Sequence, residues 1–187
     1  MQLNILASKS PRRKDLLNQI GFKFSVVDSQ FKEYKNNNVP PEALAETLAR
    51  EKALSVAKIY PDNIIIGADT IVTIENKILG KPKDENESFE MLNLISGKSH
   101  EVITGVAFIQ LSKNIDHTFN QQTVVTLSDI SKREISSYIE KYKPFDKAGS
   151  YGIQDWFAVN VEKIDGCFYN VMGFPLARFW KEINELI

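Results

Sequence analysis

Two hydroxyl and two guanidinium side chains lie close together near the start of the chain, in the segment SKSPRR at residues 8–13. Ser10 precedes Pro11, and this order predicts a helix that has Ser10 as its N-cap. A helix N-terminus offers unpaired N–H groups and a partial positive charge, and arginine adds bidentate donors for phosphate. The segment therefore suits a polyphosphate, although a simple helix start with solvated arginines explains the same residues equally well.

A single acidic residue, Asp69, follows the apolar run at residues 64–66 in the sequence GADT. We expect it at the exit of a buried strand, where an acidic side chain could hold a divalent cation or orient a water molecule. A turn aspartate that binds its own backbone is the more common outcome for such a residue. Asp69 alone therefore does not establish a catalytic site.

Two further segments place a side chain that can bind phosphate or a base within a turn. In LGKP, at residues 79–82, glycine and proline define a turn that presents Lys81, whose compact charge suits a phosphate oxygen. At residues 146–154, two glycines bracket Tyr151, and Gln154 follows with an amide that can donate to and accept from a base edge. Each segment also has a simpler interpretation as a solvated surface turn.

The charge balance narrows the classes of function. The 187 residues are 43% hydrophobic and 25% charged, and 23 basic residues nearly balance 24 acidic ones. Such a chain has no general positive field that would attract nucleic acid or an anionic membrane, so any anion site must be local. We expect no nucleic-acid partner.

Cysteine, histidine and hydropathy patterns indicate the compartment. The lone cysteine, Cys167, excludes an intramolecular disulfide framework and fits a reducing compartment. His100 and His117 show no metal-ligand spacing, which disfavours zinc chemistry. The N-terminal apolar run and the longer apolar runs are too short for a signal peptide or a membrane span. We expect a cytoplasmic protein without membrane association.

Hydrophobic periodicity predicts strands and helices in mixed order. Strands are expected at residues 3–7, 24–27, 63–68, 70–79 (strand or hairpin), 102–111, 119–127, 157–163 and 168–171, and helices at residues 11–20, 41–60, 84–95, 131–142 and from 175 onward. This order predicts an α/β fold of the mixed α+β type, with a central mixed, twisted sheet flanked by helices and a substrate cleft. We expect residues 1–187 to form a single domain.

Seven segments, in the same order and along nearly the whole chain, resemble the Maf family of septum-formation-inhibitor-like nucleotide pyrophosphatases. They are LASKSPRR at 6–13, AREKA at 49–53, GADT at 67–70, GKP at 80–82, LISG at 94–97, HEVITGV at 100–106 and DKAGSYGIQ at 146–154. Each segment is weak alone, but chance does not explain seven in register. The resemblance implies a Maf and inosine-triphosphatase-like fold, and hydrolysis of a nucleoside triphosphate between its α and β phosphates to give the monophosphate and pyrophosphate.

The resemblance also implies roles for individual residues. Positions that match the family's phosphate-binding residues are Ser8, Arg13, Lys52 and Lys81. Asp69 matches the catalytic acid, and Glu33 matches a further acidic position, so both would serve a divalent cation such as Mg²⁺ or Mn²⁺. From the residues alone, Lys52 would be a charged helix surface residue and Glu33 a loop acid.

Three positions resemble the subgroup that acts on dTTP and UTP, namely Arg12, Thr70 and Gln154. A sister group, with SPW, SDQ and a glutamate at these places, prefers 7-methyl-GTP. An amide can both donate and accept, which suits the O4 and N3–H edge of uracil or thymine. The chain departs from the usual pattern at Ser150, where alanine is frequent, and at residues 155–156, where Asp-Trp replaces small residues.

Two alternatives stay open at this stage. The chain could be a purine-type pyrophosphatase that acts on inosine triphosphate or 7-methyl-GTP, although GADT and YGIQ favour the pyrimidine subgroup. It could also be a non-catalytic nucleotide-binding regulator of septum formation. A house-cleaning activity linked to arrest of cell division and assembly as a homodimer are both compatible with the sequence, which carries no direct signal of either.

Overall fold

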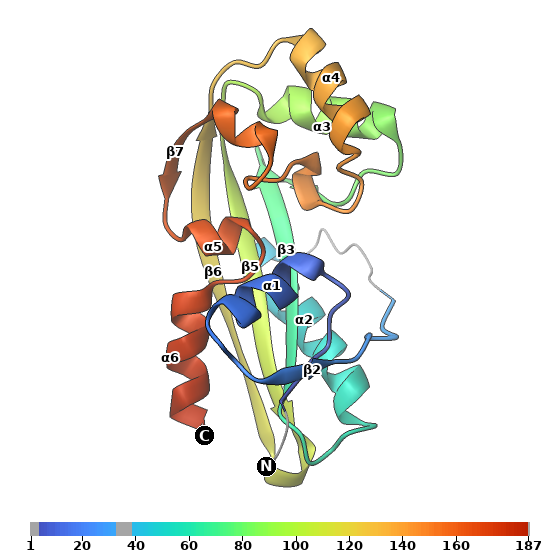
Figure 1. The fold of residues 1–187 in the computed structure, drawn as a ribbon, viewed down its shortest axis with the longest axis vertical. Helices are drawn as coiled ribbons and strands as arrows, with labels where there is room; N and C mark the ends of the chain where they lie inside the picture. The colour runs from blue at the N-terminus through green and yellow to red at the C-terminus, as the bar shows by residue number, and fades with distance from the viewer. Residues whose placement is uncertain (1–3, 33–38, 187) are drawn as a thin grey trace. The chain divides into compact units, whose positions relative to one another are not determined.

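The structure, a computed structural model, describes residues 4–32 and 39–186 and contains a seven-stranded mixed sheet. The strand order is β2-β1-β3-β5-β6-β7, and β4 pairs with β3. Strand β1 is parallel to β2 and β3, whereas β4 is antiparallel to β3 and β7 is antiparallel to β6. Helices flank this sheet (Figure 1), so the predicted α/β fold class is confirmed.

The elements follow the mixed order that periodicity predicts. The strands are β1 (Asn4–Leu6), β2 (Phe24–Val26), β3 (Ile65–Ile74), β4 (Lys77–Leu79), β5 (Ser99–Gln110), β6 (Ile115–Leu127) and β7 (Val161–Asp165). The α-helices are α1 (Pro11–Gln19), α2 (Pro41–Ala57), α3 (Glu85–Ile95), α4 (Lys132–Tyr142), α5 (Phe168–Val171) and α6 (Leu176–Leu186). Short 3-10 helices are η1 (Leu111–Lys113), η2 (Ala148–Ser150) and η3 (Trp156–Asn160).

The chain divides into two compact units. Unit 1 consists of Met1–Thr70, Thr104–Gln121 and Gly173–Ile187, and unit 2 consists of Ile71–Ile103 and Gln122–Met172. Strands β3, β5 and β6 each contribute residues to both units. The expectation that the whole chain works as a single domain stays a prediction.

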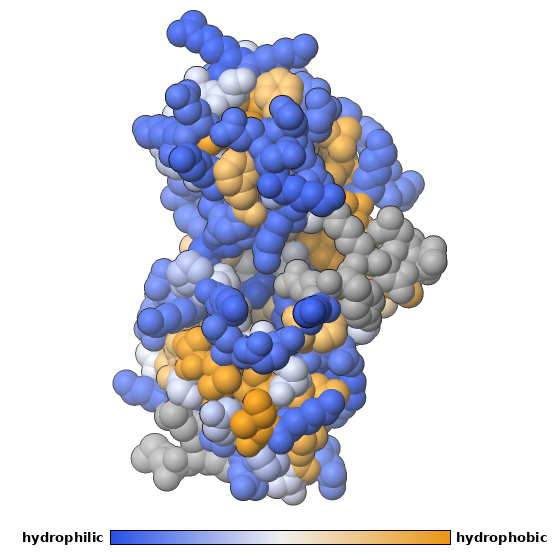
Figure 2. Space-filling view, turned by 90° about the vertical axis from the view of Figure 1, so that its right-hand side faces the viewer, coloured by the Kyte–Doolittle hydropathy of each residue, from blue (hydrophilic) through white to orange (hydrophobic). Residues whose placement is uncertain are grey.

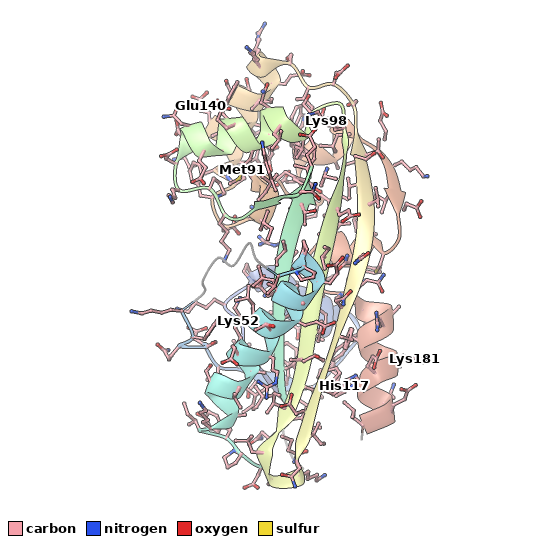
Figure 3. The ribbon with its side chains drawn as sticks, turned by 180° about the vertical axis from the view of Figure 1, so that it is seen from behind. Lys52, Met91, Lys98, His117, Glu140 and Lys181 are labelled. Atoms are coloured by element: carbon pink, nitrogen blue, oxygen red, sulfur yellow. The ribbon has the colours of Figure 1, made fainter. Side chains whose placement is uncertain are left out.

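In unit 1, helices cover both faces of strand β5. Ala107 and Ile109 join a core with Ala49 of α2. Phe108 lies between them in the strand, and its ring centroid is 5.7 Å from that of Phe179 on α6. Because successive side chains of a strand point to opposite faces, α2 and α6 cover opposite faces of the sheet. Figure 1 shows α1 in front of the strands, and Figure 3 shows α2 in front when the molecule is seen from behind.

In unit 2, helices α3 and α4 pack together (Figure 1) over an apolar core. Met91 and Leu92 of α3 and Ile139 of α4 belong to this core. The predicted capping box at the start of α4 is present, because Ser131 and Glu134 each satisfy a backbone N–H of the other. The buried stripe and the N-cap together explain why this segment is a helix.

Strand β3 corrects one prediction about Asp69. Residues 63–68 and 70–79 are predicted as separate segments with Asp69 at the exit of the first. The structure shows one strand that continues through Asp69 to Ile74, and then the expected turn at residues 75–76 leads into β4. Asp69 therefore lies in the middle of a strand, because the small residues before it pack closely against a helix instead of ending the strand.

The segment after α4 corrects two more predictions. Residues 157–163, predicted as a strand, begin as the 3-10 helix η3, whose first turn is capped by Asp155. Residues 168–171, also predicted as a strand, form helix α5. There Asn170 is buried and donates to the Val102 carbonyl and to Thr123 Oγ1. Short apolar runs do not distinguish strand from helix, so such tertiary contacts decide their conformation.

The surface view of Figure 2 shows hydrophilic residues over much of one face, with apolar residues grouped in patches between them. Charged residues of both signs are nearly equal in number in the sequence. Among residues 4–32 and 39–186, no helix combines the length and the apolar character needed to cross a membrane.

Candidate active site

A buried ion pair joins α2 to β3 in unit 1. Lys52 Nζ lies 2.5 Å from Asp69 Oδ1, and each residue is only 8% exposed. Figure 3 shows Lys52 on α2. Its burial corrects the interpretation of this position as a charged helix surface. Two opposite charges that leave water together are tolerated because each compensates the other.

The close approach of α2 to β3 depends on small residues. A Cβ atom added to Gly67 would overlap the carbonyl oxygen of Ala49 and lie 2.9 Å from the Cβ of Ala53. Lys52 lies between these two alanines in α2, and Asp69 lies on the same face of β3 as Gly67 because it is two residues further along. The missing side chain at Gly67 therefore sets the spacing at which Lys52 and Asp69 meet.

Arg13 donates hydrogen bonds from all three of its guanidinium nitrogens, and the residue is only 9% exposed. Nε donates to the Gly173 carbonyl at 2.9 Å, and Nη2 donates to Thr70 Oγ1 at 3.0 Å. Nη1 donates to the Ala68 carbonyl at 2.9 Å and to Ser8 Oγ at 3.2 Å. One guanidinium thus ties α1 to the loop before it, to β3 and to the segment before α6.

This hydrogen-bond network holds the residues on both sides of Asp69 in the chain, because Arg13 donates to the Ala68 carbonyl and to Thr70 Oγ1. Thr70 Oγ1 also lies 3.0 Å from Thr104 Oγ1 on β5. Both residues adjoining Asp69 are therefore fixed by hydrogen bonds, and the backbone that carries its carboxylate has little freedom to move. The predicted phosphate-binding Arg13 and the predicted specificity residue Thr70 contact each other directly.

Ser8 is the second predicted phosphate-binding residue that lies beside Arg13. Its Oγ accepts hydrogen bonds from Arg13 Nη1 and from the backbone N–H of Ser10, both at 3.2 Å. With its lone pairs engaged in this way, the hydroxyl can act toward a ligand as a donor, which is the role that a phosphate oxygen requires. Ser10 occupies the predicted N-cap position of α1, although its side chain makes no capping hydrogen bond.

The predicted residues of unit 2 belong to two segments that the fold brings together. The Gly149 N–H donates to the Gly80 carbonyl at 3.2 Å, which joins the turn that carries Lys81 to the segment that carries Gln154. Both Lys81 and Gln154 are exposed. In this segment Ser150, the departure from the family's frequent alanine, lies with its Oγ 2.5 Å from Ser88 Oγ on α3.

Tyr151, directly before the turn that carries Gln154, is buried against His100. Its hydroxyl lies 2.7 Å from His100 Nε2, and the two rings meet edge to face with centroids 5.4 Å apart. Burial lowers the pKa of His100 to about 4 and raises the pKa of Tyr151. Both groups are therefore neutral at neutral pH, and the hydrogen bond between them joins uncharged partners.

Other predicted positions complete the description of the site. Arg12 is half-buried in the first turn of α1, and Glu33 lies outside the residues that the structure describes. The sequence reasoning assigned no role to Thr104, to the Gly173 carbonyl or to Tyr138, although each contacts a predicted residue or its neighbours. A backbone carbonyl or a single threonine forms no motif that predicts its partner, so these contacts become evident only in the three-dimensional structure.

The described residues test whether a divalent cation fits this site. Within residues 4–32 and 39–186, no group of three or more His, Cys, Asp or Glu side chains is placed to hold a metal ion. Asp69 supplies one carboxylate, of which Oδ1 binds Lys52. Mg²⁺ is often held by only one or two protein carboxylates together with substrate phosphates, so a site of this composition fits such an ion.

Comparisons with known proteins identify the family. Residues 4–186 match the Maf-like protein family. The chain belongs to this family. Proteins similar in sequence to this Maf-like chain include several that are named dTTP/UTP pyrophosphatase. One from Carboxydothermus hydrogenoformans is 46% identical over 180 residues, which cover 96% of each chain. Another from Bacillus pumilus is 49% identical over 174 residues, or 93% of this chain and 91% of that one. A third, from Bacillus cereus, is 46% identical over 185 residues, or 99% and 96%.

Proposed function

We propose that this Maf-like chain is a nucleoside triphosphate pyrophosphatase that hydrolyses dTTP and UTP to the monophosphate and pyrophosphate. Relatives of nearly equal length at 46–49% identity carry that name. The structural observation that best supports the proposal is the buried pair of Lys52 and Asp69, whose backbone neighbours are held by Arg13. This arrangement offers fixed positive charge and one fixed carboxylate, which are the groups that phosphoanhydride hydrolysis needs.

The reaction requires a water oxygen to bond to the α-phosphorus while the bond from that phosphorus to the bridging oxygen breaks. Asp69 orients the attacking water through its carboxylate and accepts the proton that the water releases. Lys52 compensates the charge of this carboxylate and keeps it in one position. Ser8, Arg13 and Lys81, together with Lys52, bind phosphate oxygens and stabilise the charge that leaves with pyrophosphate.

A divalent cation, Mg²⁺ or Mn²⁺, completes the proposed chemistry. Asp69 and Glu33 would hold it, and it would neutralise charge on the phosphate oxygens when bound. Asp69 would then serve both as a ligand and as the residue that orients water. Its single carboxylate is compatible with either role.

Base selection is proposed to depend on Arg12, Thr70 and Gln154. The amide of Gln154 is exposed and can donate and accept, which matches the O4 and N3–H edge of a pyrimidine. Thr70 holds Arg13 through its hydroxyl, so its contribution to selectivity includes the position of that guanidinium.

We also propose the setting in which the enzyme works. It acts as one domain over residues 1–187, in the cytoplasm, as a homodimer and without nucleic-acid partners. Hydrolysis of surplus or modified pyrimidine triphosphates would be a house-cleaning activity that accompanies arrest of cell division. The lone cysteine supports the cytoplasmic compartment, and the near balance of charges supports the absence of a nucleic-acid partner.

The proposal is tested by pyrophosphate release from a panel of canonical and modified triphosphates with Mg²⁺ or Mn²⁺. We expect dTTP and UTP to be the best substrates and Asp69→Ala to lower kcat at least about 100-fold. Asp15→Ala, which removes an exposed carboxylate from α1, is the matched control and should leave kcat unchanged. Undiminished activity of Asp69→Ala would contradict the mechanism, and nucleotide binding without pyrophosphate release would favour a non-catalytic regulator.

A further inference from the structure

A tight turn presents Gln154 in unit 2. The Asp155 N–H donates to the Gly152 carbonyl at 3.3 Å, so residues 152–155 form a β-turn with Ile153 and Gln154 at its two central positions. Ile153 is buried, whereas Gln154 is exposed. The plane of this turn therefore determines the direction of the Gln154 side chain.

A single phenolic oxygen binds both ends of this turn. The Gly152 N–H donates to Tyr138 Oη at 3.1 Å, and Tyr138 Oη donates to Asp155 Oδ2, also at 3.1 Å. A phenol has one proton to donate and lone pairs to accept, so the two bonds have opposite directions and do not compete. Burial and the nearby Asp155 charge raise the pKa of Tyr138, so its hydroxyl keeps this proton.

The groups around the phenol leave it little room to move. Tyr138 is 1% exposed, and its ring centroid lies 5.0 Å from that of Phe157 and 5.1 Å from that of Tyr142. The other carboxylate oxygen of Asp155 accepts from the Phe157 N–H at 3.0 Å. A Cβ at Gly152 would lie 2.6 Å from Asp155 Oδ2, so a larger residue there would displace this carboxylate.

We propose that Tyr138 and Asp155 are positioning residues for base selection, because they hold both ends of the turn that directs Gln154. The inference rests on the proposed function and adds residues that do not themselves contact the base. Asp155 is also one of the two positions at which this chain departs from the small residues usual in the family after Gln154. The aspartate at this unusual position thus accepts a hydrogen bond from the Tyr138 hydroxyl on α4.

The test compares Tyr138→Phe with the wild type in steady-state hydrolysis of UTP, alone and in a Gln154→Ala background. Loss of one buried hydrogen-bonding oxygen should raise KM for UTP about ten-fold. The kcat value should change by less than about two-fold, because the groups of unit 1 are untouched. In the Gln154→Ala background, Tyr138→Phe should add nothing further to KM.

Tyr142→Phe is the matched control. It removes a hydroxyl from the same helix, and that hydroxyl makes no hydrogen bond to any residue that the structure describes. KM should equal the wild-type value. Asp155→Asn, which leaves one acceptor oxygen where there were two, gives a second route to the same result and should also raise KM without lowering kcat.

The outcomes separate this inference from the proposed function. Suppose that the wild type releases pyrophosphate from UTP, but Tyr138→Phe and Asp155→Asn both keep the wild-type KM. The positioning role is then wrong, while the proposed pyrophosphatase activity stands. The same conclusion follows if Tyr138→Phe raises KM as much in the Gln154→Ala background as in the wild type. If the wild type releases no pyrophosphate from any triphosphate, the proposed function fails and the inference fails with it. If Tyr138→Phe does not fold, Asp155→Asn alone decides between these results.

Discussion

The two units hold their predicted substrate-binding residues in different ways. Unit 1 buries charged groups and pairs them within the protein, as in the ion pair of Lys52 with Asp69 and the hydrogen bonds that Arg13 donates to Ser8, Ala68, Thr70 and Gly173. Unit 2 buries neutral groups, such as the pair of His100 with Tyr151, and leaves the predicted binding side chains exposed.

This difference is clearest between Ser8, Arg13 and Asp69 of unit 1, which are proposed to act on the triphosphate, and Gln154 of unit 2, which is proposed to read the base. A triphosphate carries several negative charges, so its site needs positive groups that already have fixed positions before the ligand arrives. A pyrimidine edge is neutral and is recognised by the direction of one amide, which requires a rigid backbone turn but no buried charge. Buried charges without partners are costly, so unit 1 depends on pairing and unit 2 does not.

The largest effect on stability should come from breaking the ion pair of unit 1. Lys52→Met leaves the Asp69 carboxylate buried without compensation, so the free energy of unfolding should fall by about 4 kcal/mol. Adding Asp69→Leu to Lys52→Met should recover much of this loss, because no charge is then left buried. Urea unfolding measures both variants, with the exposed Lys58→Met at the end of α2 as the control. Wild-type stability of Lys52→Met would remove the contrast between the units.

The next effect should appear in unit 2 as a pH dependence. The pKa of His100 is about 4 in the folded protein and about 6.5 in the unfolded chain, so between these values only the unfolded state binds the proton. Its contribution to stability is present in full above pH 6.5 and is lost as the pH falls toward 4. The loss should be about 3 kcal/mol, and His100→Asn should not show it.

Urea unfolding at pH 7 and at pH 4 measures this difference, because the other titrating groups contribute equally to both proteins. An identical loss in the wild type and in His100→Asn would show that the neutral pair is not maintained by burial.

A smaller effect should follow from replacing the guanidinium of unit 1 by an amine. Arg13→Lys keeps the charge but cannot reach acceptors as far apart as the Gly173 carbonyl and Thr70 Oγ1, so stability should fall by about 2 kcal/mol. The control is Arg133→Lys on α4, which is exposed and should change stability by less than about 0.5 kcal/mol. A lysine that leaves stability unchanged would mean that Arg13 serves the ligand alone.

Local signals in the sequence predicted much of the fold. The run before residue 8, the proline at the start of α1 and the capping box of α4 are each decided by neighbours in the chain, and all three elements are present. Helix α5 could not be predicted, because it depends on hydrogen bonds from Asn170 to residues 47 and 68 positions away. Contacts of this range depend on the packing of the whole unit.

The candidate site likewise has features that local sequence predicts and features that depend on distant contacts. The residue types of Ser8 and Arg13 indicated an anion site, and the fold brings the two into contact. Asp69 indicated a site for a cation or a water molecule. The burial of Lys52 could not be predicted, because a lysine in a helix is ordinarily a surface residue and the partner that neutralises it lies on a strand 17 positions later. The hydrogen bonds of Tyr138 to the turn at residues 152–155 could not be predicted either, because a tyrosine in the buried stripe of a helix is ordinarily a core residue.

Gly67 sets the distance between the two members of the ion pair, because the backbone of α2 lies closer to β3 than any side chain at position 67 would allow. Selection for the reaction therefore acts on atoms that never meet a substrate. A residue larger than glycine at position 67 would push against the Ala49 carbonyl and the Ala53 Cβ, and would change the separation of Lys52 and Asp69. The residues proposed to read the base could therefore change without disturbing the ion pair, whereas enlarging Gly67 would disturb it without touching the base.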